Sequence, residues 1–276
     1  MSTERRVVTM GTHWSRSSRL AGVNVRRAPR LLGVDACRGG WAVAWVEGRG
    51  STPVSRTRRE AWGQGAIELD LERDFSSVLA RAGADGVAAI DMPIGLPDGE
   101  PRACDREARA VLGQRRASSV FPAPVRRTLA ATTYADGCAA SLDTCGRALS
   151  QQTFHLLPRI REVDALVTPV LQQRIREVHP EVVFASLAGG AGLAAPKRRP
   201  EGHALRLALL ATALGPLPNV GEARRRLGRS AVGLDDLVDA LACLVAAGRI
   251  AAGSARRLPA VEAPRDARGL LMEILF

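Results

Sequence analysis

The sequence predicts an α/β fold in which helices flank a mixed sheet of five strands. Two short apolar runs, residues 31–34 and 87–90, each end in an aspartate and are typical of buried strands. The second run is continuously apolar, as expected for a strand of a parallel sheet that is covered on both faces. A late segment, residues 233–249, is apolar almost all round and predicts a buried helix.

The amino-terminal part of the sheet is predicted to be a β-meander over residues 31–59. Its first two strands are separated by residues 37–40, whose sequence Cys-Arg-Gly-Gly suits a tight turn. The third strand, residues 52–58, has the weakest pattern. Residues 67–82 then carry apolar side chains at helical spacing and stop at Gly83, which predicts a helix.

The fourth strand, residues 87–91, precedes Pro93, which cannot donate a hydrogen bond to a neighbouring strand. We therefore expect residues 93–171 to leave the sheet as a mostly helical insertion. The chain is expected to return as a fifth strand at residues 175–178. The remaining elements are two apolar helices and a candidate closing strand, at residues 202–214, 233–249 and 269–276.

The composition is that of an ordinary globular protein, with 46% hydrophobic and 24% charged residues. No apolar run approaches the ~18 residues that a membrane-spanning helix needs, so we expect no membrane association. The five cysteines are odd in number and show no Cys-x-x-Cys spacing. This pattern favours neither a disulfide framework nor a zinc site, and it suits the reducing cytoplasm.

The net charge of +11 is concentrated near the amino terminus. Residues 1–30 hold seven arginines against one glutamate and so account for +6 of it. Residues 31–276 are only mildly basic, so net charge alone is weak evidence for nucleic-acid binding. We expect residues 1–28 to be a disordered, dispensable basic leader or the result of a start codon placed too far upstream, although their composition also resembles a transit peptide. Residues 29–276 are expected to form one domain.

Four aspartates indicate a metal site. Asp35 and Asp91 end apolar strands, and an acid at the tip of a buried strand is costly unless it is paired or binds a metal. Asp236 and Asp239 are three residues apart and therefore share one face of the late helix. A capping role would suit Asp235 at the helix start but suits Asp239 poorly. Hydrolysis by two metal ions needs acids from several elements, and Mg²⁺ or Mn²⁺ prefers such oxygen ligands.

Six segments in order along the chain resemble domain of unknown function 429, a bacterial branch of predicted RNase H-like nucleases in the RNase H superfamily. The late acidic pair is also similar to that of RuvC-type resolvases. The matching segments are GVDACRGGW (33–41), IDMPIGL (90–96), SVFPAP (119–124), QTF (152–154), EVHPE (177–181) and DDLVDA (235–240). The resemblance implies an RNase H-like sheet and a metal-dependent nuclease that acts on DNA or RNA.

The resemblance also implies roles for the acids. Asp35 would bridge two Mg²⁺ or Mn²⁺ ions, Asp91 would hold one of them, and Asp236 with Asp239 would hold the other. RNase H enzymes carry a further helical glutamate, for which Glu72 is the nearest candidate.

The segment His179-Pro180-Glu181 has two interpretations. Glu181 could be a further catalytic carboxylate with His179 as a proton shuttle. Alternatively, the segment is the first turn of a helix, where proline and an acid are both favourable.

Lys197 is the only lysine among 39 basic residues. A compact ammonium fits beside a phosphate or a metal-bound water where a planar guanidinium does not, and the family has a lysine followed by Glu-Gly and an arginine, matching Lys197, Glu201, Gly202 and Arg206. We therefore expect Lys197 to be catalytic. Four arginines are expected to bind substrate phosphates: Arg38, Arg102, Arg109 and Arg206.

The alternative for the arginines of residues 102–109 is a solvated helix face, on which Asp105 and Glu107 balance the positive charge. Aromatic residues make up only 4% of the chain, so a base-stacking platform is not expected. The three aromatic residues of the insertion are expected to be packing residues: Phe121, Tyr134 and Phe154.

Two other functions are compatible with the sequence. The first is a phosphoryl-transfer or nucleotide-hydrolysing enzyme on the same fold, although the chain has no Walker sequence and only a faint Gly-rich turn at residues 37–40. The second is a non-catalytic nucleic-acid-binding scaffold. The joint presence of four aspartates at strand ends and on one helix counts against a vestigial site.

Overall fold

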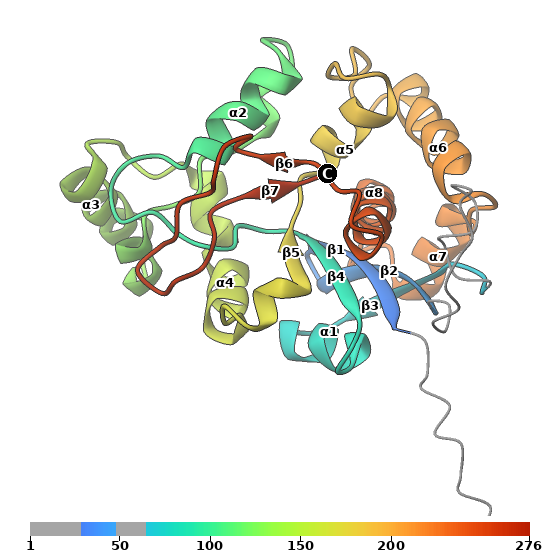
Figure 1. Cartoon of the computed structure of the whole chain (residues 1–276), viewed down its shortest axis with the longest axis horizontal. Helices are drawn as coiled ribbons and strands as arrows, with labels where there is room; N and C mark the ends of the chain where they lie inside the picture. The colour runs from blue at the N-terminus through green and yellow to red at the C-terminus, as the bar shows by residue number, and fades with distance from the viewer. Residues whose placement is uncertain (1–28, 48–64) are drawn as a thin grey trace, which may run out of the picture.

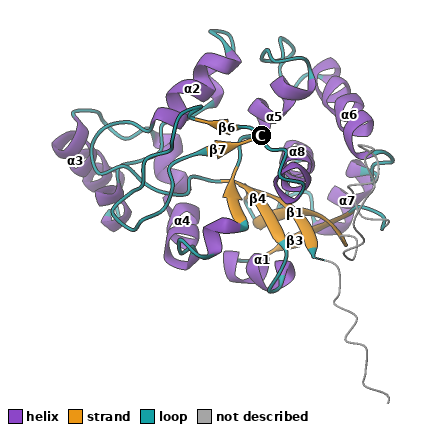
Figure 2. Cartoon of the chain, viewed as in Figure 1, coloured by secondary structure: helices purple, strands orange, loops and turns teal. Residues whose placement is uncertain are grey.

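A computed structural model of the chain describes residues 29–47 and 65–276. Its centre is a mixed sheet with strand order β3-β2-β1-β4-β5 (Figures 1 and 2). Strands β1, β2 and β3 pair antiparallel, whereas β1, β4 and β5 pair parallel. This sheet confirms the predicted α/β fold. The strands are β1 Arg30–Cys37, β2 Gly40–Glu47, β3 Glu68–Glu72, β4 Val87–Asp91 and β5 Ile175–Glu177.

Helices cover both faces of the sheet, with α8 on one face and α1 and α4 on the other (Figure 1). Three α-helices and three short 3-10 helices lie between β4 and β5. None of the described helices combines the length and the apolar character that crossing a bilayer requires. The helices are α1 Phe75–Ala82, α2 Ala103–Leu112, α3 Tyr134–Cys145, α4 Gln151–Leu166, α5 Pro180–Leu187, α6 Pro200–Leu214, α7 Val220–Leu227 and α8 Leu234–Ala251.

The two faces of the sheet carry side chains of different size. Small residues lie under α8, among them Gly33, Ala42, Ala44 and Ala89. Larger ones face α1 and α4, among them Leu32, Val34, Trp41, Val43 and Ile90. Because small side chains let a helix backbone approach the sheet, α8 is buried without interruption from Leu237 to Gly248.

The structure of residues 67–82 differs from the sequence prediction. Residues 67–82 were expected to be one helix, but the first part is strand β3 and helix α1 begins only at Phe75. Leu69 is buried and pairs with Ala44 of β2, so the apolar residues of this part alternate as in a strand. Asp74 then caps α1 by accepting a hydrogen bond from the Ser77 N–H at 2.8 Å. The predicted strand at residues 52–58 lies outside the described residues.

The carboxyl terminus does not extend the main sheet as a long strand. Strand β7 covers only Ile274–Leu275 and pairs with β6, Arg257–Leu258, in a separate two-stranded sheet. A single bridge between Val178 and Leu275 connects this small sheet to the end of β5. Because β5 has only three residues, the sheet edge that it forms is short, and strand β7 lies beside the carboxyl end of β5.

We predict that Gly33→Ala destabilises the fold strongly. A Cβ at residue 33 would lie 2.0 Å from the Leu244 nitrogen and 2.1 Å from the Ala240 oxygen, both backbone atoms of α8. Overpacking of this kind costs about 3 kcal/mol, which lowers the Tm of a chain of this size by roughly 6–12 °C. Thermal unfolding followed by circular dichroism measures the effect.

Gly99→Ala is the matched control, since a Cβ there would meet no atom closer than 3.8 Å. Its Tm is expected to stay within a degree or two of wild type. Equal Tm values for the two variants would show that α8 can move away from β1 at little cost.

Candidate active site

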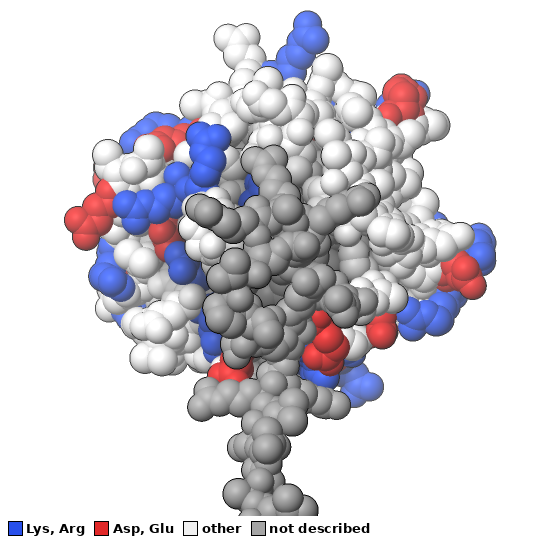
Figure 3. Space-filling view, turned by 45° about the vertical axis from the view of Figure 1, so that its right-hand side comes forward, with Lys and Arg blue, Asp and Glu red and all other residues white. Residues whose placement is uncertain are grey.

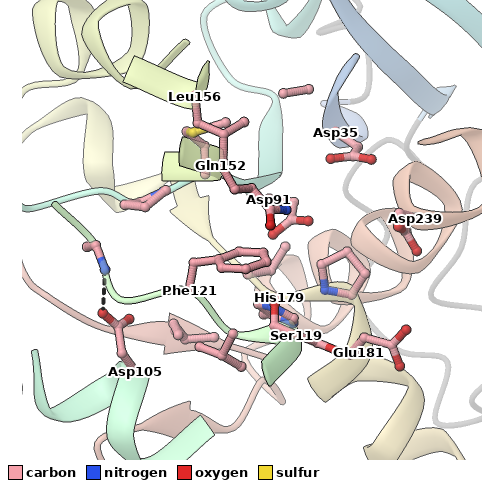
Figure 4. Close-up of a pocket in the computed structure, with 18 of the residues that line it drawn as sticks. Asp35, Asp91, Asp105, Ser119, Phe121, Gln152, Leu156, His179, Glu181 and Asp239 are labelled. Carbon is pink, nitrogen blue, oxygen red and sulfur yellow. Dashed lines mark hydrogen bonds between the residues drawn. The ribbon is translucent and has the colours of Figure 1, made fainter. Parts of the chain in front are cut away.

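A cavity of about 440 Å³ opens at the carboxyl ends of β1 and β4, which carry Asp35 and Asp91 (Figure 4). One side of it is acidic and the other is largely apolar. The acidic side contains all four aspartates expected in a metal site, together with Glu181 and Lys197. Its acidic and basic lining residues include Asp35, Asp91, Asp235, Asp236, Asp239, Glu181, Lys197 and Arg198.

The pairing of β1 with β4 brings two of the acids together. In this parallel ladder Asp35 is in register with Asp91, so their side chains stand at neighbouring positions of the sheet edge. Asp35 is only 9% exposed. Burial raises the pKa of Asp35 well above its ordinary value, and the charges of Asp91 and Asp239 raise it further. Burial also raises the pKa of Asp91, although His179 and Lys197 lower it.

Helix α8 contributes Asp239, whose carboxylate is bound to Lys197. The Lys197 Nζ atom lies 2.6 Å from Asp239 Oδ2 and 3.9 Å from Asp235 Oδ2. Burial lowers the pKa of the ammonium, but the carboxylates of Asp239, Asp35 and Asp235 outweigh it and raise that pKa above its usual value. Burial raises the pKa of Asp239 to about 6, against the opposing effect of Lys197. The other oxygen, Asp239 Oδ1, is buried and has no hydrogen-bond partner among the described residues.

Asp236, and not Asp235, caps the start of α8. The residue before the helix is Gly233, which has no side chain to accept hydrogen bonds from the free backbone N–H groups of the first helical turn. Asp236 Oδ2 instead accepts a hydrogen bond from the Gly233 N–H at 2.8 Å. The expectation that Asp235 is the cap is therefore wrong: its carboxylate is partly exposed and faces Lys197.

Glu181 and Arg206 form a buried ion pair, which changes the expected role of both. Arg206 is 1% exposed, and its Nη2 atom lies 2.8 Å from each Glu181 oxygen. The same guanidinium donates to the carbonyl oxygens of Ala195 and Gly202. Arg206 therefore cannot bind a substrate phosphate as expected. Through Arg206, Glu181 is therefore connected to the backbone of Ala195, two residues before Lys197.

Arg102 is likewise buried and cannot act as the expected phosphate clamp. It makes two bonds of 2.6 and 2.7 Å to Glu177 and another of 2.6 Å to Asp105. Asp105 in turn accepts a hydrogen bond from the Ala123 N–H at 2.9 Å. This network joins β5, the start of α2 and the loop of residues 116–124. A buried charge is stable only with such partners.

The other expected phosphate ligands do not line the cavity. Arg38, in the turn between β1 and β2, and Arg109, on α2, are both exposed. They are absent from the cavity lining, to which Arg116 and Arg198 contribute instead. Both of the latter come from loops, so no helical or strand periodicity marked them in the sequence. Glu72, the candidate for a helical glutamate, lies in strand β3 and binds Arg81 at 2.6 Å.

His179 precedes helix α5, which begins at Pro180, as the helix-start interpretation of this segment required. Its Nε2 atom lies 3.1 Å from the carbonyl oxygen of Ser119. Because a carbonyl can only accept, Nε2 must carry the proton, which leaves Nδ1 of a neutral ring as an acceptor. Nδ1 is buried, and nothing within residues 29–47 and 65–276 forms a hydrogen bond with it.

The acidic side of the cavity has the chemistry of a divalent-cation site. Its donors are carboxylate oxygens from β1, β4 and α8, and the unpartnered Asp239 Oδ1 is a buried acceptor available to a cation. Over residues 29–47 and 65–276, however, no three potential ligands are already gathered as a metal cluster. Lys197 occupies one oxygen of Asp239, and the helix cap occupies one of Asp236. A cation bound by Asp239 Oδ1 would thus share this carboxylate with the Lys197 ammonium, which contacts Oδ2.

Comparison with known proteins identifies a family for this chain. The model of a family described as "Protein of unknown function (DUF429)" matches residues 33–263, a range that includes every acid of the site. No curated protein and no solved structure matches significantly.

We predict opposite effects for two acid-to-amide substitutions in this site. Asp35→Asn removes a charge from a buried cluster of like charges, so the Tm measured in EDTA at pH 8 should stay the same or rise. Glu181→Gln leaves the buried guanidinium of Arg206 without its counter-charge and should cost about 3 kcal/mol. A large fall in Tm for Asp35→Asn would instead give Asp35 a structural role.

Proposed function

The chain belongs to the DUF429 family of proteins of unknown function, and we propose that it is a metal-dependent nuclease that hydrolyses phosphodiester bonds of DNA or RNA. One observation carries this proposal: aspartates from β1, β4 and α8 line one cavity together with Lys197. The proposal includes a cytoplasmic location. The five free thiols support it, because the cytoplasm keeps cysteines reduced.

In this proposal Asp35, Asp91, Asp236 and Asp239 would hold two Mg²⁺ or Mn²⁺ ions. When bound, such ions activate the attacking water and stabilise the leaving oxygen. The buried and unpartnered Asp239 Oδ1 supports the assignment, as do the raised pKa values of Asp35 and Asp91, since a nearby cation would favour the ionised forms.

Lys197 has two consecutive roles in the proposed reaction. In the free protein its ammonium offsets part of the charge of the aspartates through the 2.6 Å contact with Asp239. Its side chain is 37% exposed and can turn toward a bound strand, whereas the Asp239 side chain, 5% exposed, would then need a bound cation as its counter-charge. There it would bind a non-bridging phosphate oxygen and stabilise the negative charge that develops during hydrolysis.

His179 is the residue best suited to move a proton in this site. The hydrogen bond to Ser119 orients its ring and keeps the proton on Nε2. The free Nδ1 could then accept a proton from the attacking water.

The proposed affinity for nucleic acid rests on the cavity and not on a general basic surface. The net charge of +11 has a large contribution from the arginines of residues 1–30. On the face shown in Figure 3, Lys and Arg side chains lie in separate groups, several of them beside Asp or Glu.

One observation favours a second function, hydrolysis of a free nucleotide. A cavity of about 440 Å³ is of the size that encloses a small molecule. The same aspartates and Lys197 would then act on a phosphate of the nucleotide.

A single panel of substrates tests both functions. Wild-type protein is incubated with single-stranded, duplex, hybrid and branched nucleic acids and with nucleoside triphosphates, each with Mg²⁺, Mn²⁺ or EDTA. We expect cleavage of a nucleic acid that requires metal and is lost in Asp91→Asn. Cleavage of nucleotides alone would support the second function. If no substrate is hydrolysed, titration calorimetry with Mg²⁺ separates a non-catalytic scaffold from an inactive metal site.

We predict that Lys197→Arg lowers turnover at least tenfold, or about 1.4 kcal/mol of transition-state stabilisation. A guanidinium can still pair with Asp239, so the Tm should not change. Its larger, planar group does not fit beside a phosphate where a compact ammonium does, so turnover should fall. Arg199→Lys is the control, because Arg199 is exposed and lies outside the cavity lining. Wild-type turnover in Lys197→Arg would make Lys197 a simple counter-charge.

A further inference from the structure

The apolar side of the cavity is not used by the proposed hydrolysis. It is formed by residues 120–124 and by the first turns of α4, with Gln152 and Leu156. Phe121 is 36% exposed, and it is the one aromatic residue among the large exposed hydrophobic side chains of the described segments. In Figure 4 its ring projects into the cavity, whose lining it shares with Asp91 and His179. The expectation that Phe121 is a packing residue is therefore wrong.

Hydrogen bonds fix the loop that carries Phe121 both before and after this residue in the chain. Two residues before it, the carbonyl oxygen of Ser119 accepts the hydrogen bond from His179. Two residues after it, the N–H of Ala123 donates to Asp105, a bond that Figure 4 shows. Proline at positions 122 and 124 restricts the backbone further. The ring is thus kept exposed by bonds that do not depend on its own packing.

An exposed and fixed aromatic ring next to acids is suited to a planar ligand whose other end is a phosphate. A nucleobase stacks on an aromatic side chain whatever its sequence. The side-chain amide of Gln152 is exposed at the same part of the cavity and can both donate to and accept from the edge of a base. Arg198, beside Lys197 on the rim, is available to the neighbouring phosphate.

We infer that Phe121 is the stacking platform for one unpaired base of the strand that is cut, with Gln152 at the edge of that base. This inference rests on the proposed nuclease function and narrows its substrate to single-stranded nucleic acid. A base inside a duplex is stacked on its neighbours and cannot lie on the ring, so a paired substrate would first have to release it.

Binding and cleavage of matched strands test the inference. The probes are a short fluorescein-labelled oligothymidylate, the same strand with abasic residues in place of thymidine, and a blunt duplex. Fluorescence polarisation measures Kd in EDTA and in Mg²⁺, and gel analysis measures initial cleavage rates. We expect Phe121→Ala to weaken binding of the intact strand about tenfold and to leave binding of the abasic strand unchanged. Phe121→Trp should restore binding.

Leu205→Ala is the control for loss of an exposed apolar side chain, since Leu205 lies on α6 outside the cavity; it should bind like wild type. The inference is overturned if Phe121→Ala binds the intact strand as tightly as wild type, or if wild type binds the duplex as tightly as the single strand. Cleavage of both strands that is unaffected by Phe121→Ala would retain the nuclease and reject the subsite. Base-dependent binding through Phe121 without any cleavage would retain the subsite and reject the nuclease function.

Discussion

The contact between the backbones of α8 and β1 sets how close the aspartates of the helix lie to those of the sheet in the candidate site. Gly33 has no Cβ, and α8 lies so close that an added one would be 2.1 Å from the oxygen of Ala240. Asp239 is therefore held near Asp35, which follows Gly33 by two residues. The parallel pairing of β1 with β4 then adds Asp91 in register. The acidic cluster is thus a consequence of how closely a helix of small residues packs on the sheet.

The acids around the cavity fall into two groups that differ in their partners. Glu177 and Glu181 each accept two bonds from a buried arginine, so their charge is balanced and they hold segments in place. The aspartates, in contrast, share the ammonium of Lys197, which contacts Asp239 and Asp235. Such an excess of buried negative charge disfavours the free cluster and favours a bound cation. The carboxylates of the two glutamates therefore stabilise the fold, whereas those of the aspartates are available for the proposed reaction.

The wrong predictions have identifiable physical causes. Arg102 was assigned to a helix face with Arg109, but its partner Glu177 is 75 residues away in the chain, and nothing in the local pattern indicates that pair. Phe121 was assigned to packing because aromatic residues make up only 4% of the chain, whereas hydrogen bonds at Ser119 and Ala123 hold its loop at the cavity. The β3 region contains apolar residues that fit a strand and a helix alike over so short a range.

The α/β fold, the strands that end in Asp35 and Asp91, and the late helix with Asp236 and Asp239 were all available from the sequence. Each leaves a local signal, because strands and helices repeat their apolar residues at a short and characteristic period. Local sequence patterns did not indicate the partner of each acid, the contact of Lys197 with the aspartates or the exposure of Phe121. They depend on contacts between loops and distant elements, such as Lys197 with Asp239, 42 residues apart. Contacts of this kind have no period, so only the folded chain brings their members together.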